Sequence, residues 1–152
     1  MFFIRFFIVC FLFFPEFVFA VDQVPSVTVG LLKTAKQTYD HEWEFSDNIS
    51  DMLLRFGARV ILIDYNKIMQ SDNVVSASSE LLADEVYKSV KSFFVKNEIK
   101  RVFIPGNYYN LDTEPYPPTP NRQLVTNAIV RILDEDPSIN IMAVCGGLQG
   151  VA

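Results

Sequence analysis

Residues 138–152, "SINIMAVCGGLQGVA", carry an apolar run into Cys145, and Gly146 and Gly147 follow directly. A short apolar run of this kind is typical of a buried strand. Glycines permit the tight backbone path by which a strand turns into a helix. The sequence therefore predicts that Cys145 lies where a strand ends and a helix begins.

Upstream of this turn, strand and helix patterns alternate. Strands are expected at 24–32, 58–65, 100–106 and 137–144, and helices at 46–56, 79–97 and 124–133. Strands that alternate with helices pair in parallel through right-handed crossovers. We therefore expect an α/β fold: an incomplete doubly wound, flavodoxin-like parallel sheet with helices on both faces, which ends at the Cys145 turn.

Local signals predict how some of these elements are built. Ser46 is a candidate N-cap of the first helix, Phe56 belongs to its apolar face, and Gly57 is a candidate C-cap. The four consecutive apolar residues 60–63 are typical of a strand that is covered on both faces. Residues 66–79 are expected to form a polar turn.

The first twenty residues differ from the rest of the chain. Arg5 precedes an apolar run from Phe6 to Phe14, Pro15 interrupts it, and Val18 and Ala20 occupy the positions that a signal peptidase reads. We expect a signal peptide at 1–20 and one domain at 21–152, secreted or periplasmic. The alternative is an uncleaved N-terminal membrane anchor, although such a span needs about 20 apolar residues.

Charge and cysteine content exclude several classes of partner and site. The net charge is −5 and no basic stripe occurs, so nucleic acid is not an expected partner. Without the leader, Cys145 is the one remaining cysteine, which makes it either an inert buried residue or a free reactive thiol. His41, Glu42 and Glu44 fix no metal geometry in a loop, and there is no second histidine. We expect neither a metal nor a cofactor.

The Cys145 turn has the features of a nucleophile elbow. A nucleophile on a strand-to-helix turn needs small neighbours, which Gly146 and Gly147 provide. The Gly146 amide is then aimed at a developing oxyanion, and the start of the following helix favours negative charge. The alternative is that Cys145 is a small apolar residue at a strand end and that the glycines only form the turn.

Three motifs carry a resemblance to a known family. Residues 143–149 match the elbow pattern G-[IV]-C-x-G-x-Q, except that Ala143 replaces the first glycine. Pro105, Gly106 and Asn107 stand where the family has P-G-G, and Arg122 follows a Pro- and Tyr-rich loop, where the family has Arg-Asp. From Val24 onward the chain resembles the N-terminal half of a class I glutamine amidotransferase-like domain. It is most similar to the gamma-glutamyl hydrolase and gamma-glutamyl-gamma-aminobutyrate hydrolase branch, a group of cysteine peptidases.

The resemblance implies a set of site residues and a substrate. Cys145 would be the nucleophile, Gly146 and Gly106 would supply oxyanion amides, and Gln149, Arg122 and Asn107 would shape the pocket for a gamma-glutamyl small molecule. The family's catalytic His and Glu lie downstream of the cysteine, whereas the one histidine here is His41. The resemblance thus implies a truncated member that is inactive alone and needs a second polypeptide with the C-terminal half.

Three other interpretations remain open at this point. The chain can be a non-catalytic remnant or an association module that binds another chain through an uncovered sheet edge. It can belong to the intracellular-protease and glyoxalase-like superfamily, whose elbow A-[IV]-C-x-G fits Ala143, with Glu42 or Glu44 acting beside Cys145. Finally, His41 can serve as the catalytic base.

Overall fold

The computed structural model describes residues 27–34, 42–106 and 119–152. The predictions for the leader, for His41 and for Asn107 lie outside the described residues.

The described chain forms a sheet of four parallel strands, as the alternation of the sequence predicts. They are β1 (Thr28–Leu32), β2 (Arg59–Ile63), β3 (Arg101–Ile104) and β4 (Asn140–Ala143), in the order β2-β1-β3-β4. In the centre, Gly30 of β1 lies between Ile61 of β2 and Val102 of β3. The crossovers diverge on either side of β1, so the topological switch point lies between β1 and β3.

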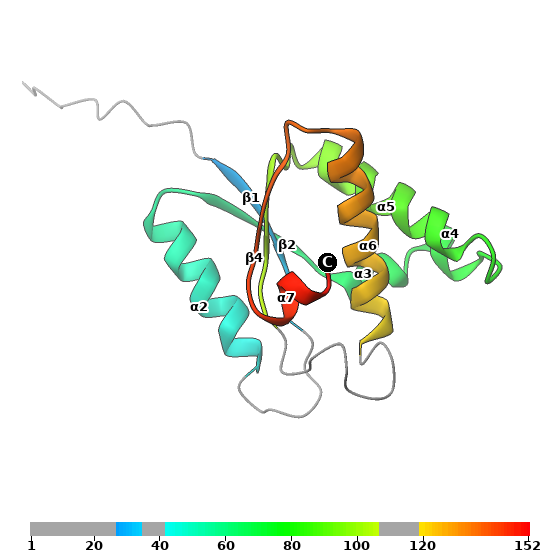
Figure 1. The fold of residues 1–152 in the computed structure, drawn as a ribbon, viewed down its shortest axis with the longest axis horizontal. Coiled ribbons are helices and arrows are strands. Elements are labelled where there is room, and N and C mark those ends of the chain that lie inside the picture. The colour runs from blue at the N-terminus through cyan, green and yellow to red at the C-terminus, as the bar shows by residue number, and fades with distance from the viewer. Residues whose placement is uncertain (1–26, 35–41, 107–118) are drawn as a thin grey trace, which may run out of the picture.

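Helices cover both faces of this sheet, which confirms the predicted doubly wound arrangement (Figure 1). The helix α2 (Glu42–Arg55) covers one face. On the other face lie α3 (Tyr65–Met69), α5 (Leu82–Lys96) and α6 (Pro120–Glu135), with the short α4 (Asp72–Val75) packed against α5. After β4, Val144 and Cys145 lead into the short α7 (Gly146–Gln149).

The apolar core is divided by the sheet. Under α2, Ile49 and Leu53 pack against Val29, Leu31 and Phe103. The larger cluster lies on the opposite face and joins the sheet to the other helices; its fully buried members include Leu32, Ile63, Val86, Val90, Ile104, Val125 and Ile129. Most of the apolar residues whose helical spacing predicts α5 and α6 from the sequence therefore belong to this core or pack against it.

The predicted ends of the first helix are partly wrong. The helix begins at Glu42, so Ser46 is not its N-cap; instead the buried Ser46 Oγ accepts the Thr34 amide at 3.1 Å and pairs with the Thr34 hydroxyl. Phe56 is 84% exposed; it lies just beyond Arg55, where the helix ends, and does not belong to the buried face. Gly57 does follow the helix with φ of +79°, as its C-cap role requires.

The second strand and the segment after it also differ from expectation. β2 is an edge strand, and Leu62 is 46% exposed rather than covered on both faces. Residues 66–79 hold most of α3 and all of α4 instead of a polar turn. Asp64 caps α3 by accepting the Asn66 amide, and Ile68 and Val74 are buried in the core.

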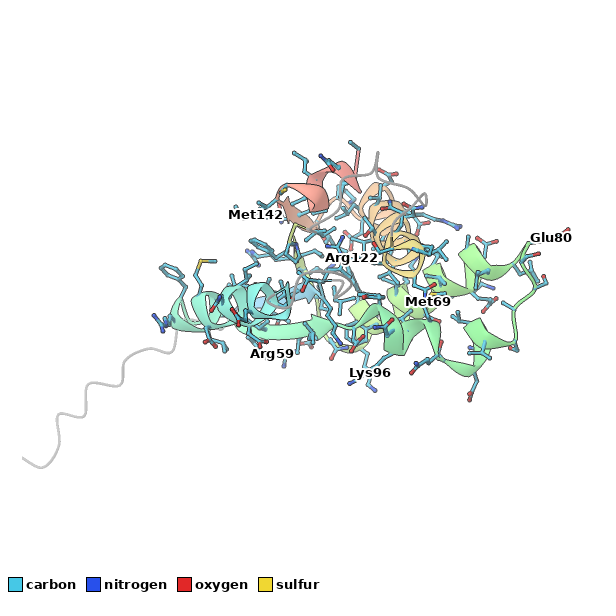
Figure 2. All side chains as sticks on the ribbon, turned by 90° about the horizontal axis from the view of Figure 1, so that it is seen from below. Arg59, Met69, Glu80, Lys96, Arg122 and Met142 are labelled. Atoms are coloured by element: carbon cyan, nitrogen blue, oxygen red, sulfur yellow. The ribbon has the colours of Figure 1, made fainter. Side chains whose placement is uncertain are left out.

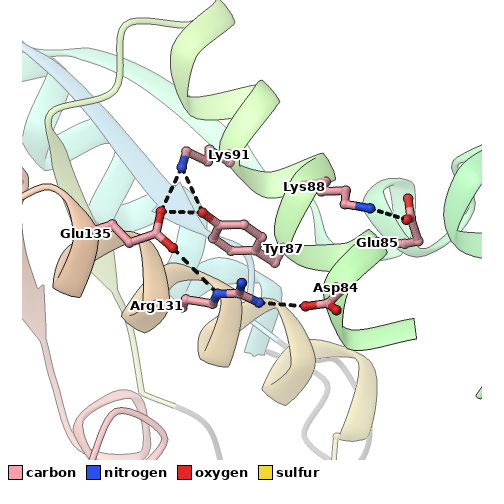
Figure 3. A network of polar contacts seen from close by, with 7 residues as sticks. All are labelled: Asp84, Glu85, Tyr87, Lys88, Lys91, Arg131 and Glu135. Atoms are coloured by element: carbon pink, nitrogen blue, oxygen red, sulfur yellow. Dashed lines mark hydrogen bonds and ion pairs between the residues drawn. The ribbon is translucent and has the colours of Figure 1, made fainter. Parts of the chain in front are cut away.

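Polar contacts join α5 to α6 on the surface (Figure 3). The Tyr87 hydroxyl donates to Glu135, and Lys91 Nζ donates to both of them, at 2.8 and 2.7 Å. Glu135 raises the pKa of Lys91 to about 12, and Lys91 in turn holds the pKa of Glu135 below its ordinary value. The Arg131 guanidinium lies 3.9 Å from the centre of the Tyr87 ring. These contacts fix the two long helices relative to each other.

An ion pair at the C-terminal end of α6, between Lys100 and Asp136, should make the stability of the fold depend on pH in the acid range. Lys100 Nζ lies 2.8 Å from Asp136, and this contact, with donors from Ser138, lowers the pKa of Asp136 from 3.8 to about 2. A lowered folded-state pKa contributes stability above the unfolded-state value, and that stability is lost as pH falls toward the folded-state value. We expect Asp136→Asn to destabilise the fold at neutral pH and the effect to vanish as pH falls from about 4 to about 2.

Urea unfolding at a series of pH values measures this prediction. Lys100→Met removes the partner, so the double variant should lose little more stability than Asp136→Asn alone. A destabilisation by Asp136→Asn that stayed constant across that pH range would contradict it.

Candidate active site at the carboxyl end of β4

Cys145 occupies a strained position between β4 and α7. Its backbone has φ of 52° and ψ of −125°; Glu98 is the other non-glycine residue with positive φ among the described residues. Such a conformation costs on the order of 1–3 kcal/mol in a non-glycine residue. The turn is closed by hydrogen bonds from the Gly147 amide to Val144 O and from the Gln149 amide to Cys145 O. The strand-to-helix turn predicted from the sequence is therefore present.

The loop after β3 lies against the Cys145 side chain. Cys145 is free and exposed. A Cβ atom added at Gly106 would lie 3.0 Å from Cys145 Cβ and 3.6 Å from its Sγ. On the other side of Cys145, Gly146 opens α7, and the first amides of a helix have no acceptor within it. The structure thus brings together Cys145 and both residues predicted to supply oxyanion amides.

Gly147 seats α7 on the end of β3. A Cβ atom at this position would lie 2.4 Å from Ile104 O and 2.6 Å from Pro105 O. Both are backbone atoms, so no side-chain movement can make room. The second glycine of the turn is therefore required by close approach, and it fixes the distance between the elbow and the loop that contains Gly106.

Arg122 is buried at the start of α6, between that helix and the sheet (Figure 2). Its Nη2 donates to Pro105 O at 2.7 Å and its Nε donates to Lys33 O at 3.1 Å. The guanidinium thereby bridges the ends of β1 and β3 at the topological switch point. The role of Arg122 in substrate binding stays a prediction; the contacts described are to backbone carbonyls.

Gln123, which the sequence does not single out as a site residue, anchors the far end of α7. Its Nε2 donates to Gly150 O at 2.9 Å and to Asn127 Oδ1 at 2.8 Å. The contact joins α6 to α7 across 27 residues of chain, so no local pattern could indicate it. Gln149 is exposed at the last position of α7, next to this anchor.

Glu42 and Glu44, the carboxylates of the alternative interpretation, belong to a helix that packs on a different part of the sheet. Glu44 lies in the first turns of α2, which packs across β1 and β2, whereas Cys145 follows β4 at the opposite edge. The Glu42 side chain lies outside what the structure describes. The roles of Glu42 and Glu44 beside Cys145 stay predictions.

No protein-family model, curated protein or solved structure matches this chain. The family resemblance of residues 143–149 therefore stays a prediction.

A second polar region also lies at the carboxyl ends of the strands, next to β1 and β2. A cavity of about 420 Å³ is lined by Lys33, Thr34, Ser46, Asp47, Leu62, Tyr65 and Asn66. Burial alone would raise the pKa of Asp64, but the hydrogen bond and positive charge of Lys33, 3.0 Å away, hold that pKa below its ordinary value. The Lys33–Asp64 ion pair thus joins the ends of β1 and β2.

The described part of the chain has neither a cluster of metal-binding side chains nor a membrane-spanning helix. It holds no group of three or more His, Cys, Asp or Glu side chains that could bind a metal ion. None of its helices has the length and apolar character needed to cross a membrane.

Proposed function

We propose that this chain carries the nucleophile of a cysteine hydrolase that cleaves gamma-glutamyl amide bonds through a thioester on Cys145. The observation that supports it most is the positive φ of Cys145, beside Gly106 and in front of Gly146. A glycine would form this turn without strain, whereas cysteine places a thiol at the carboxyl end of the sheet. Strained non-glycine residues cluster at functional sites, where the backbone must present a side chain.

The proposed reaction follows from this arrangement. The Cys145 thiolate attacks the gamma-carbonyl carbon, a C–S bond forms, and negative charge develops on the carbonyl oxygen. The amides of Gly146 and Gly106 donate to that oxygen. The C–N bond then breaks, the amine leaves with a proton, and water hydrolyses the thioester. The proposed proton donor is His41, the one histidine of the sequence, or a group on a second polypeptide.

The resemblance of residues 143–149 supports the choice of a gamma-glutamyl substrate. Gln149 and Arg122 would shape the pocket, together with Asn107. We further propose the secreted or periplasmic location that the leader predicts.

A second candidate function, association with another chain, is favoured by the outer edge of the sheet. Met142 is 61% exposed on β4, and Val144 and Leu148 are 45% and 58% exposed. Residues 138–152 contain no charged side chain, although charges commonly protect an exposed edge strand. Association that depends on concentration and is abolished by Met142→Lys would support an added strand from a second polypeptide beside β4.

An activated ester tests the hydrolase proposal without requiring an acid catalyst. In a Cys10→Ser background, Cys145 is the sole thiol. Above the spontaneous release from the ester itself, gamma-glutamyl 4-nitrophenyl ester should then give a burst of one 4-nitrophenolate per chain, and Cys145→Ala should give no burst. The alpha-glutamyl isomer should react more slowly. An equal burst from Cys145→Ala, or equal rates for the two isomers, would overturn the proposed nucleophile or the proposed substrate class, respectively.

A further inference from the structure

The buried Arg122 guanidinium holds one peptide unit of the candidate site. Its Nη2 donates to Pro105 O at 2.7 Å, and Arg122 is 3% exposed. The peptide unit that contains Pro105 C=O also contains the Gly106 N–H. A hydrogen bond to that carbonyl therefore acts on the predicted oxyanion donor directly.

The planarity of the peptide group makes this contact directional. In a trans peptide, C=O and N–H point in opposite directions within one plane, so fixing the carbonyl fixes the amide. Gly106 has no Cβ and permits many backbone conformations, including rotation of this plane. The charge-assisted hydrogen bond from Arg122 opposes that rotation, since such bonds are stronger than those between neutral groups.

The neighbours of this peptide hold it in place from the other side. Gly147 packs so closely on Pro105 O that a Cβ there would be 2.6 Å away, and a Cβ at Gly106 would be 3.0 Å from Cys145 Cβ. The second donor of Arg122, Nε, is fixed by Lys33 O at 3.1 Å. The carbonyl is thus held between α6 and α7, and its orientation is set relative to the Cys145 turn.

We propose that Arg122 is a positioning residue, which orients the Gly106 amide toward the oxyanion that forms at Cys145. This inference rests on the proposed function. It is separate from a role in the substrate pocket, because it concerns the contacts of the guanidinium with the backbone of the site.

Two reactions of the same thiol separate oxyanion stabilisation from thiol reactivity. The Cys145 thiolate attacks gamma-glutamyl 4-nitrophenyl ester through an oxyanion, forms a C–S bond and expels 4-nitrophenolate. Iodoacetamide is displaced at carbon, with loss of iodide and with no oxyanion. Both reactions use the thiolate. Differences in the accessibility and ionisation of the Cys145 thiol therefore cancel in the ratio of the acylation rate to the alkylation rate. The wild-type protein unfolded in urea gives the reference value of this ratio, for a thiol that has no oxyanion site.

The full chain in the Cys10→Ser background carries the test. One oxyanion donor is worth about 10² to 10³ in rate. We expect the folded wild-type ratio to exceed the unfolded ratio by about 10² or more, and Arg122→Met to lower it at least about tenfold. Arg122→Lys lacks the planar fork that bridges both carbonyls, so its ratio should lie between those of the wild type and Arg122→Met. Alkylation rates should change little.

The outcomes distinguish this inference from the function on which it rests. A folded wild-type ratio equal to the unfolded one would refute the oxyanion site itself. A ratio in Arg122→Met equal to that of the wild type would overturn only the role of Arg122. The same holds if Arg122→Met raises the saturation constant for the ester and leaves the maximal acylation rate unchanged. If Arg122→Met loses its helical circular dichroism, Arg122→Lys decides, and a wild-type ratio in that variant overturns the inference.

Discussion

Replacing Gly147 by Ala is expected to destabilise the fold by about 3 kcal/mol, at the upper end of overpacking effects, and to abolish the ester burst at Cys145. The added methyl group would lie 2.4 Å from Ile104 O and 2.6 Å from Pro105 O. Because both oxygens belong to the backbone at the end of β3, either α7 lifts or the Gly106 loop moves. Urea unfolding followed by circular dichroism measures the stability.

Gly150→Ala is the matched control for this substitution. It adds the same methyl group three residues later, where the nearest atom is the flexible Gln123 Oε1 at 3.2 Å. Gly150 has φ of −72°, which alanine adopts without strain. We expect a change of less than about 0.5 kcal/mol, as for substitutions away from special sites. Equal stability of the two variants would contradict the seating of α7 on β3.

The second large effect is expected in a comparison of leaving groups. Cys145 should be acylated by gamma-glutamyl 4-nitrophenyl ester but should attack the corresponding 4-nitroanilide at least about 10²-fold more slowly, since general acid–base catalysis is worth about 10² to 10⁴. Nitrophenolate leaves without a proton, whereas an anilide nitrogen requires one. Among the described residues, no side chain is hydrogen-bonded to Cys145 to supply it. Release of 4-nitrophenolate and of 4-nitroaniline measures the two rates.

On the proposed gamma-glutamyl hydrolase chemistry, a separate polypeptide that carries a catalytic His and Glu should accelerate hydrolysis of the anilide. His41→Ala is the control for the remaining possibility. Rapid hydrolysis of the anilide by the chain alone, lost in both His41→Ala and Cys145→Ala, would contradict this prediction and make His41 the base.

The elements of the fold could be predicted where their signal is local. Val86, Val90 and Phe94 recur at helical spacing and are buried in α5 as that spacing requires. The exposure of Leu62 could not be predicted, because burial of a strand depends on its place in the sheet, and an edge strand can have the same apolar run as a central one. The early start of α2 was missed because Ser46 is a strong N-cap type but bonds to Thr34 in the preceding loop.

The candidate site likewise combines a local turn, which the sequence predicts, with long-range contacts, which it does not predict. Cys145, Gly146 and Gly147 are consecutive, so the sequence predicts their turn directly. The contacts of Arg122 join segments that are 17 and 89 residues apart, and depend on how α6 meets the ends of β1 and β3. The sequence can name the residue but not the carbonyls that it binds.

Mass spectrometry of the acylated protein tests most directly whether Cys145 is an acyl-forming nucleophile. The Cys10→Ser protein, quenched in acid during the ester burst, should carry one glutamyl group per chain. After proteolysis, that group should lie on the peptide that contains Cys145 and should be released by hydroxylamine, as a thioester is. A glutamyl group on any other residue, or an unmodified Cys145 after a complete burst, would contradict the proposed chemistry.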